Sequence, residues 1–358
     1  MSAVDVVIAV HAASRPVARA VASVVQGNPA RTRLTLVCHG IEVDEVAARL
    51  VPEHRRQVTW LEHHDGVPSA SGPFNAGIAA ARGDFVSMLG SDDWLEAGAV
   101  DSWLALASAS GADCVMTRLA LGRPARRVPT PPVRPARGRS RLVDPVRDRL
   151  SYRSAPLGLV STQARARLGV ALTEGMPVGG DVAYVTRLWC ESRVAVDGRG
   201  PGYVIGEDAA DRVTYAARPI QEELGFVTHL LGQAWFAAYP QRTRRAVATK
   251  LLRIHVFGAV SRRPDPSWWS AAQREALARV SRDVLAAAPG VSDALSRADH
   301  ALIDAILASD VSAVTLLERA RARRRHGHPQ TLLPGRLGAM LEPEAPLRFM
   351  SASWWASR

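Results

Sequence analysis

The first 120 residues alternate between apolar runs and stretches with apolar side chains at helical spacing. Residues 4–10 are almost wholly apolar, which is typical of a strand buried on both faces. Residues 15–25 follow with valines at the spacing of an amphipathic helix. The same alternation predicts strands at 32–38, 57–61, 84–89 and 112–119, and helices at 41–50, 75–81 and 98–108. Strands that alternate with helices indicate an α/β domain with a Rossmann-like, mainly parallel sheet.

The rest of the chain is mostly helical. Further elements are expected as strands at 155–162, 194–196 and 203–205 and as helices at 163–168 and 182–192. The apolar spacing then predicts helices at 220–239, 241–260, 270–287, 291–308 and 310–325. We therefore expect an α/β domain over residues 1–215 and a helical subdomain over residues 216–358. Residues 118–149 hold ten arginines and six prolines, which favours a long loop over a phosphate-facing flap.

Composition narrows the class of protein. Hydrophobic residues make up 47% of the 358 residues and the mean hydropathy is -0.03, as in globular proteins. The cysteines Cys38, Cys114 and Cys190 form no CxxC pair, which argues against a disulfide framework or a cysteine-rich zinc site. No apolar run reaches the roughly 18 residues of a membrane span, and the N-terminus lacks a basic n-region. We expect a cytoplasmic protein, with peripheral contact to the inner face of the membrane left open.

The net charge of +11 is built almost entirely from arginine. Lys250 is the only lysine, which excludes Schiff-base or phosphate-loop lysine chemistry elsewhere in the chain. A basic balance suggests an anionic partner such as nucleic acid, a lipid headgroup or a nucleotide. Ten arginines lie in residues 118–149 and several more in residues 319–325, away from the segments with candidate chemistry, so the charge alone is weak evidence for any of these.

An acidic turn, Asp92-Asp93, follows the strand predicted at 84–89. Adjacent carboxylates need a cation or hydrogen-bond donors to offset their charge, and a divalent metal that bridges substrate phosphates is one solution. The alternative is that Asp93 caps a helix beginning near Trp94. His11 and His39 also follow predicted strands, so these polar groups are expected at one edge of the sheet.

Two segments of the chain carry a characteristic pattern. The first runs from Gly72 to Leu95, and its pattern residues are Asn75, Gly77, Ala81, Gly83, Phe85, Asp92 and Asp93. The second is GDVAYVTRLW at 180–189. In their order and spacing the two segments resemble family 2 glycosyltransferases of the GT-A type, and the resemblance implies that Asp181 stands at the position of the family's catalytic base. The resemblance covers roughly residues 4–215.

The resemblance implies an inverting transfer of a sugar from a nucleotide diphosphate sugar to an acceptor hydroxyl. Asp181 would act as general base, and Asp92, with Asp93 less certain, would hold Mg²⁺ or Mn²⁺. The nucleotide would be contacted by His11, Arg15, His39, Asp65, Asn75 and Asp92. The acceptor is expected to be a cell-surface glycan, a lipid-linked saccharide or a small molecule. From the residues alone, Arg15 could equally be a solvated surface arginine, a turn is favoured for Asp65, and Asp181 could cap the helix that starts at Val182.

Departures from the family pattern leave a second hypothesis open. Gly90 stands where the first acidic residue of the turn is usual, Phe74 where an arginine often precedes the asparagine, and Gly180 where an acidic residue is usual. His39 lies near the position of a usual aspartate. The alternative is a catalytically inactive GT-A-fold protein that binds nucleotides or glycans. The hypothesis of a nucleic-acid-binding protein rests on the charge alone, because the sequence has no helix-turn-helix, zinc or RNP pattern. Nucleic acid is therefore not an expected partner.

Three further features have an ordinary and a functional interpretation. His255 is more consistent with an interior histidine than with a metal ligand. The pairs Trp268-Trp269 and Trp354-Trp355 are expected to pack at helix ends, with a membrane surface or sugar rings as alternatives. The basic run at 319–329 is expected to be a solvated helix face that could also attract an anionic polymer.

Overall fold

The computed structural model describes residues 3–134, 142–208 and 218–357. A seven-stranded sheet has the strand order β10-β6-β9-β4-β1-β2-β3. All neighbouring pairs are parallel except those of β9, which runs antiparallel to β4 and β6. The strands are β1 (Val4–Val10), β2 (Thr32–His39), β3 (Val58–His63), β4 (Phe85–Gly90), β6 (Cys114–Thr117), β9 (Gly158–Ser161) and β10 (Val194–Asp197). The predicted α/β class with a mainly parallel sheet is confirmed.

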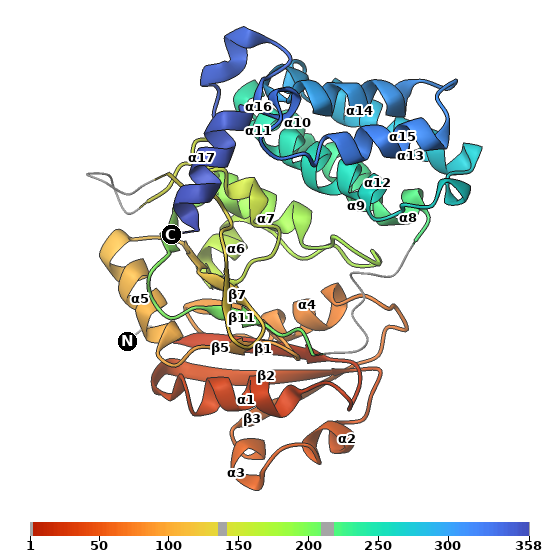
Figure 1. Cartoon of the computed structure of the whole chain (residues 1–358). Helices are drawn as coiled ribbons and strands as arrows, with labels where there is room; N and C mark the ends of the chain where they lie inside the picture. Colours follow the sequence, from red (N-terminus) through yellow and green to blue (C-terminus); the bar gives the residue numbers. More distant parts are fainter. Residues whose placement is uncertain (1–2, 135–141, 209–217, 358) are drawn as a thin grey trace.

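Helices cover both faces of this sheet (Figure 1). Side chains of β1 and β2 pack on one face against α1 and α5, and on the other face against α4, α6 and α7. The helices of this part are α1 (Val17–Val25), α2 (Val43–Ala47), α3 (Pro52–Arg55), α4 (Ser71–Ala79), α5 (Ala99–Ser110), α6 (Thr162–Leu168) and α7 (Val182–Glu191). Burial on both faces explains why β1 reads as a nearly unbroken apolar run.

A second, four-stranded sheet has the order β5-β11-β7-β8. Its strands are β5 (Trp94–Leu95), β7 (Leu119–Leu121), β8 (Arg126–Val128) and β11 (Tyr203–Ile205). Its existence corrects two sequence predictions. The single strand expected at 112–119 is two strands in different sheets, and the loop expected at 118–149 contains β7 and β8. Residues 135–141 of that predicted loop lie outside the described residues.

The C-terminal part is helical, as predicted, and lies on the side of α7 that faces away from the large sheet (Figure 1). Its helices are α8 (Ile220–Glu223), α9 (Gly225–Leu231), α10 (Ala234–Ala237), α11 (Gln241–Lys250), α12 (Phe257–Ser261), α13 (Ala271–Ala287), α14 (Arg297–Leu307), α15 (Ala313–Ala322), α16 (Pro329–Leu332) and α17 (Pro346–Ala356). A π-helical segment, Leu251–Val256, joins α11 to α12. The domain boundary predicted at 215/216 falls outside the described residues.

Several smaller expectations meet the structure here. Trp269 is buried edge-to-face against Trp268 and donates to the Arg263 carbonyl (3.1 Å), so this pair packs inside the helical part. Trp354 and Trp355, on α17, are exposed. His255 packs edge-to-face on Phe226, in agreement with an interior position. Among the helices in the part of the chain that the structure describes, none has the length and apolar character needed to cross a membrane.

Candidate nucleotide-sugar site

In the large sheet, β2 and β3 lie on one side of β1, and the next strand of this sheet along the chain, β4, lies on the other side. The order of the strands therefore reverses at β1, and the loop after β1 lies beside the loop after β4. In open α/β sheets, ligands bind beyond the carboxyl ends of the strands at such a reversal. Arg15, after β1, donates from Nη2 to Asp92 Oδ1 (2.7 Å) and from Nε to Ser91 Oγ (3.1 Å). The Arg15 and Asp92 side chains are 11% and 10% exposed. Arg15 is therefore a partner of the acidic turn and not a solvated surface arginine.

Asp93 has a different role from the one that its sequence position suggests. It does not cap a helix, because Trp94–Leu95 is strand β5 and the next helix begins at Ala99. Its carboxylate accepts from the Tyr203 hydroxyl and from the Gly206 N–H (2.8 Å). Burial and the nearby Asp93 raise the pKa of Tyr203 well above its usual value, so the hydroxyl keeps its proton as a donor. Asp93 thus ties the acidic turn to β11.

The structure explains why position 90 is a glycine and not the acidic residue that is usual in family 2 glycosyltransferases. The Gly90 N–H donates to the Tyr203 hydroxyl oxygen (2.9 Å), and the Asp93 carboxylate packs against the Gly90 α-carbon. A β-carbon at position 90 would overlap this carboxylate. A residue with a side chain at 90 would therefore displace Asp93 from Tyr203.

The donor set of the turn is compatible with a divalent metal only in part. Mg²⁺ in phosphate-binding sites usually takes one or two carboxylates, together with phosphate oxygens and water. Asp93 is engaged by Tyr203 and Gly206, so Asp92 is the carboxylate of this turn that suits the ion. Arg15 already offsets part of the Asp92 charge.

A pocket of about 430 Å³ lies next to this turn. Its lining brings together segments that are far apart in the sequence: Ser69–Ser71, Met88, Gly90, Asp93, Ala155–Leu157, Met176–Asp181, Tyr203 and Ile205. The volume is in the range of small-molecule sites. Of the residues predicted from the sequence, Asp93 and Asp181 line the pocket directly.

Asp181 lies on the pocket wall and does not cap α7. It precedes α7 at the capping position, but its side chain accepts no capping hydrogen bond from the described residues of that helix. Burial raises the pKa of Asp181 to about 6, and the charge of Lys250 acts in the opposite direction. A carboxylate with a pKa closer to neutrality is a better general base than an ordinary aspartate.

Lys250 and Tyr203 are functional candidates that the sequence reasoning missed. Lys250 is 2% exposed at the end of α11, where burial lowers its pKa to about 8 and Asp181 raises it. A single lysine among 44 arginines, set in the apolar stretch that continues with Leu251-Leu252, was the available signal. Tyr203 carried no signal, because its partner Asp93 is 110 residues away.

The remaining predicted residues do not gather at one point. Asn75 donates to the Leu172 carbonyl (2.9 Å) and to Glu174 Oε1 (2.7 Å), and the Leu172 N–H donates to Asn75 Oδ1 (3.0 Å). It therefore fastens α4 to a segment beside the pocket. His11 is exposed after β1. Asp65 makes the expected turn by accepting from the Val67 N–H (2.9 Å).

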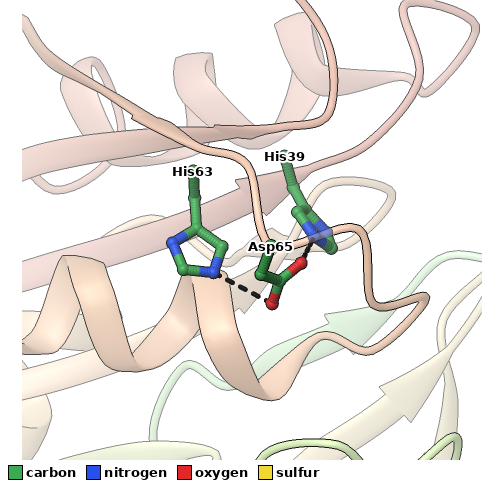
Figure 2. A group of neighbouring side chains, drawn as sticks. All are labelled: His39, His63 and Asp65. Carbon is green, nitrogen blue, oxygen red and sulfur yellow. Dashed lines mark hydrogen bonds and ion pairs between the residues drawn. The ribbon is translucent and has the colours of Figure 1, made fainter.

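His39 and Asp65 form a separate pair at the ends of β2 and β3. His39 Nε2 lies 2.7 Å from Asp65 Oδ1, with His63 on the other side of the carboxylate (Figure 2). The structure thus brings Arg15 to Asp92, and His39 to Asp65, as two groups along the same sheet edge.

Comparisons with known proteins identify similar folds. No protein-family model matches the sequence, and no curated protein matches it. The crystal structure of S. aureus TarS 1–349 in complex with UDP-GlcNAc matches with a TM-score of 0.71 and 12% sequence identity, over 91% of this chain and 93% of that chain. The chain has the fold of TarS. The same piece of TarS with UDP matches with a TM-score of 0.65 and 12% identity, over the same shares of the two chains. At these identities the likeness shows the fold, and it confirms the GT-A-type fold class.

Proposed function

We propose that this chain is an inverting glycosyltransferase of family 2 that moves a sugar from a nucleotide diphosphate sugar to an acceptor hydroxyl. The observation that carries the proposal is Asp181, a half-buried carboxylate with its pKa raised to about 6, on the wall of a 430 Å³ pocket beside the acidic turn. The TarS structures with this fold hold UDP-GlcNAc and UDP, which makes a UDP-sugar the first donor to test.

In the proposed reaction, Asp181 takes the proton of the acceptor hydroxyl. The acceptor oxygen then attacks the anomeric carbon, and the bond from that carbon to the diphosphate breaks with inversion. A positioned general base contributes typically about 10²–10⁴-fold to such a step. Arg15 offers a planar fork suited to diphosphate oxygens, and His11 would lie beside it.

A divalent ion, Mg²⁺ or Mn²⁺, would be held by Asp92. When bound, it would offset the charge that develops on the leaving diphosphate. The Arg15 guanidinium beside Asp92 would contribute to the same charge balance. Asp93 serves the site indirectly in this proposal, because it braces the turn against Tyr203.

The test of the base is Asp181→Asn, which keeps the shape of the side chain and removes its basicity. We expect UDP release from UDP-GlcNAc to fall by at least about 10²-fold, whereas UDP affinity by calorimetry stays within a factor of a few. Asp101→Asn, an exposed substitution on α5, is the matched control and should change neither value. Near-normal turnover by Asp181→Asn refutes the assigned base.

The metal is tested at Asp92. We expect Mn²⁺ to increase UDP affinity of the unmodified chain, and Asp92→Asn to abolish most of this increase, because the ion loses its protein carboxylate. Calorimetric titration of each protein with UDP, once in the presence of Mn²⁺ and once in the presence of a chelator, measures both effects. An equal Mn²⁺ effect in Asp92→Asn removes that residue from the metal site.

A second candidate is a GT-A-fold binding protein without turnover. It is favoured by the acidic turn itself, where Gly90 supplies no carboxylate, Asp93 is engaged by Tyr203 and Arg15 neutralises Asp92. This candidate would be established by UDP binding that does not depend on metal, together with no release of UDP from UDP-GlcNAc in the presence of any acceptor mixture (glycan, lipid-linked saccharide or small alcohol).

A further inference from the structure

His39 and His63 are brought together by the register of the large sheet. The strands β2 and β3 are parallel, and His39 and His63 are partners at their carboxyl ends. Partnered residues on adjacent strands project to the same face. The two imidazole rings lie with their centroids 5.5 Å apart.

Asp65 lies between the two rings (Figure 2). His39 Nε2 is 2.7 Å from Asp65 Oδ1, and His63 Nε2 is 3.1 Å from Asp65 Oδ2. Each of the three residues offers one ligand atom, and these atoms all lie within 4.8 Å of one another. Two ligands of one tetrahedral zinc ion are about 3.3 Å apart, so side-chain shifts of about 1 Å bring all three to bonding distance.

The surroundings leave the cluster close-packed on one side and open to solvent on the other. A β-carbon at position 72 would meet Asp65 Oδ2 and His63 Nε2 at 2.5 and 2.6 Å, so a side chain there would displace these two groups. The side chains of His39, His63 and Asp65 are 12%, 25% and 26% exposed. An ion can therefore enter from water, and water can fill the remaining coordination position.

We propose that His39, His63 and Asp65 bind a zinc ion. Two imidazole nitrogens and one carboxylate oxygen form the mixed donor set that suits Zn²⁺, whereas Mg²⁺ and Ca²⁺ require oxygen ligands. Three protein ligands with an open position are the pattern of exchangeable or reactive zinc sites and not of closed structural ones. Within the part of the chain that the structure describes, this is the one group of three histidine, cysteine or acidic side chains with such spacing.

A zinc ion at this position affects the nearby pocket. Residues 64–69, which have no regular secondary structure, lead from the cluster to Ser69–Ser71 on the pocket wall. A zinc ion on Asp65 holds the start of this segment against the sheet. Zinc occupancy therefore fixes one wall of the pocket and differs in place and chemistry from an Mg²⁺ or Mn²⁺ ion on Asp92.

The experiment measures zinc bound to the whole chain, without nucleotide. The protein is stripped with chelator, dialysed against buffered Zn²⁺ and assayed for metal content by mass spectrometry and for affinity by competition with a zinc indicator. We expect one zinc per chain. His39→Ala and His63→Ala should each weaken affinity by at least about tenfold, since even outer-shell changes at metal sites cost that much. His64→Ala, next to the cluster and 53% exposed, is the matched control and should bind as the parent does.

Two results overturn the proposal. One is the absence of stoichiometric zinc on the folded parent chain. The other is unchanged affinity in the double variant His39→Ala/His63→Ala, which would place the ion at other histidines such as His326 and His328. Circular dichroism establishes that each variant is folded. Asp92→Asn should retain zinc, so failure here is distinct from failure of the proposed sugar transfer.

Discussion

The charge of Lys250, in the helical part, and the charge of Asp181, on the pocket wall, influence each other's pKa. The Lys250 ammonium group is buried, and its charge lowers the pKa of Asp181 against the larger effect of burial, which raises it to about 6. Asp181 in turn favours the charged form of Lys250, the pKa of which burial lowers to about 8. The lysine therefore helps to set the pH at which Asp181 becomes a base.

The substitution Lys250→Met removes this charge and keeps an unbranched side chain of similar length. In the parent chain we expect UDP release to rise with pH through about 6, because a general base acts in its deprotonated form. In Lys250→Met the rise should move to higher pH by about 1 unit, because Asp181 loses the cation that favours its carboxylate form. The pH–rate profile of each protein measures this displacement.

Arg242→Met is the control for that experiment. Arg242 lies on the same helix, α11, but is exposed, so solvent screens its charge. Removal of the Arg242 charge should leave unchanged the pH at which UDP release rises. A profile of Lys250→Met that coincides with the parent, from a protein with parent-like circular dichroism, shows that the two charges are not coupled.

At the scale of elements, the sequence predicts what is decided locally. The strands β1, β2 and β4 are visible because burial on both faces requires long apolar runs. The short strands β5 and β8 are not visible, since two or three residues carry no periodicity and their pairing partners come from elsewhere in the chain. Helix α4 begins at Ser71, four residues before its predicted start, because a proline such as Pro73 is tolerated in a first turn.

The acidic turn shows the same limit at the site. Motif resemblance is enough to select Asp92, Asp93 and Asp181, because their order along the chain is itself the signal. The partners that decide their roles are remote in sequence: Arg15 for Asp92, and Tyr203 for Asp93. Helix capping is the alternative that the residues after Asp93 suggest when they are interpreted locally, whereas β5 forms through its antiparallel pairing with β11.

At the scale of the whole molecule, the helical part and the pocket share one core. Val182 of α7 belongs to the same buried cluster as Phe226 and Leu251, and Met176 and Val178 pack against it. Met176 and Val178 also line the pocket. The helices after residue 218 therefore support one wall of the proposed site, and their stability bears on its shape.

Glu344 joins three parts of the chain in this support. It precedes α17, and its side chain is 7% exposed. Its Oε2 accepts from the Tyr152 hydroxyl (3.0 Å) and from Arg253 Nη1 (3.2 Å), and its carbonyl accepts from Arg253 Nη2 (2.8 Å). Both residues also lie close to the Phe349 ring. The centroid of the Tyr152 ring is 4.9 Å from the centroid of the Phe349 ring, and Arg253 Cζ is 5.2 Å from the same centroid. Glu344 thus supplies the negative charge at the point where α17 meets the rest of the molecule.

The substitution Glu344→Gln keeps the shape of this contact and leaves the buried Arg253 with less compensating charge. We expect the free energy of unfolding to fall by about 1.5–3 kcal/mol, the range for a hydrogen bond to a charged group. Glu342→Gln, two residues earlier and more exposed, should change it by less than about 0.5 kcal/mol. Urea denaturation gives both values, and limited proteolysis should show earlier cleavage near α17 in Glu344→Gln alone. Equal stability of the two variants would mean that Asp299, which lies 4.0 Å from Arg253 Nε, already balances the arginine and that Glu344 is dispensable for docking α17.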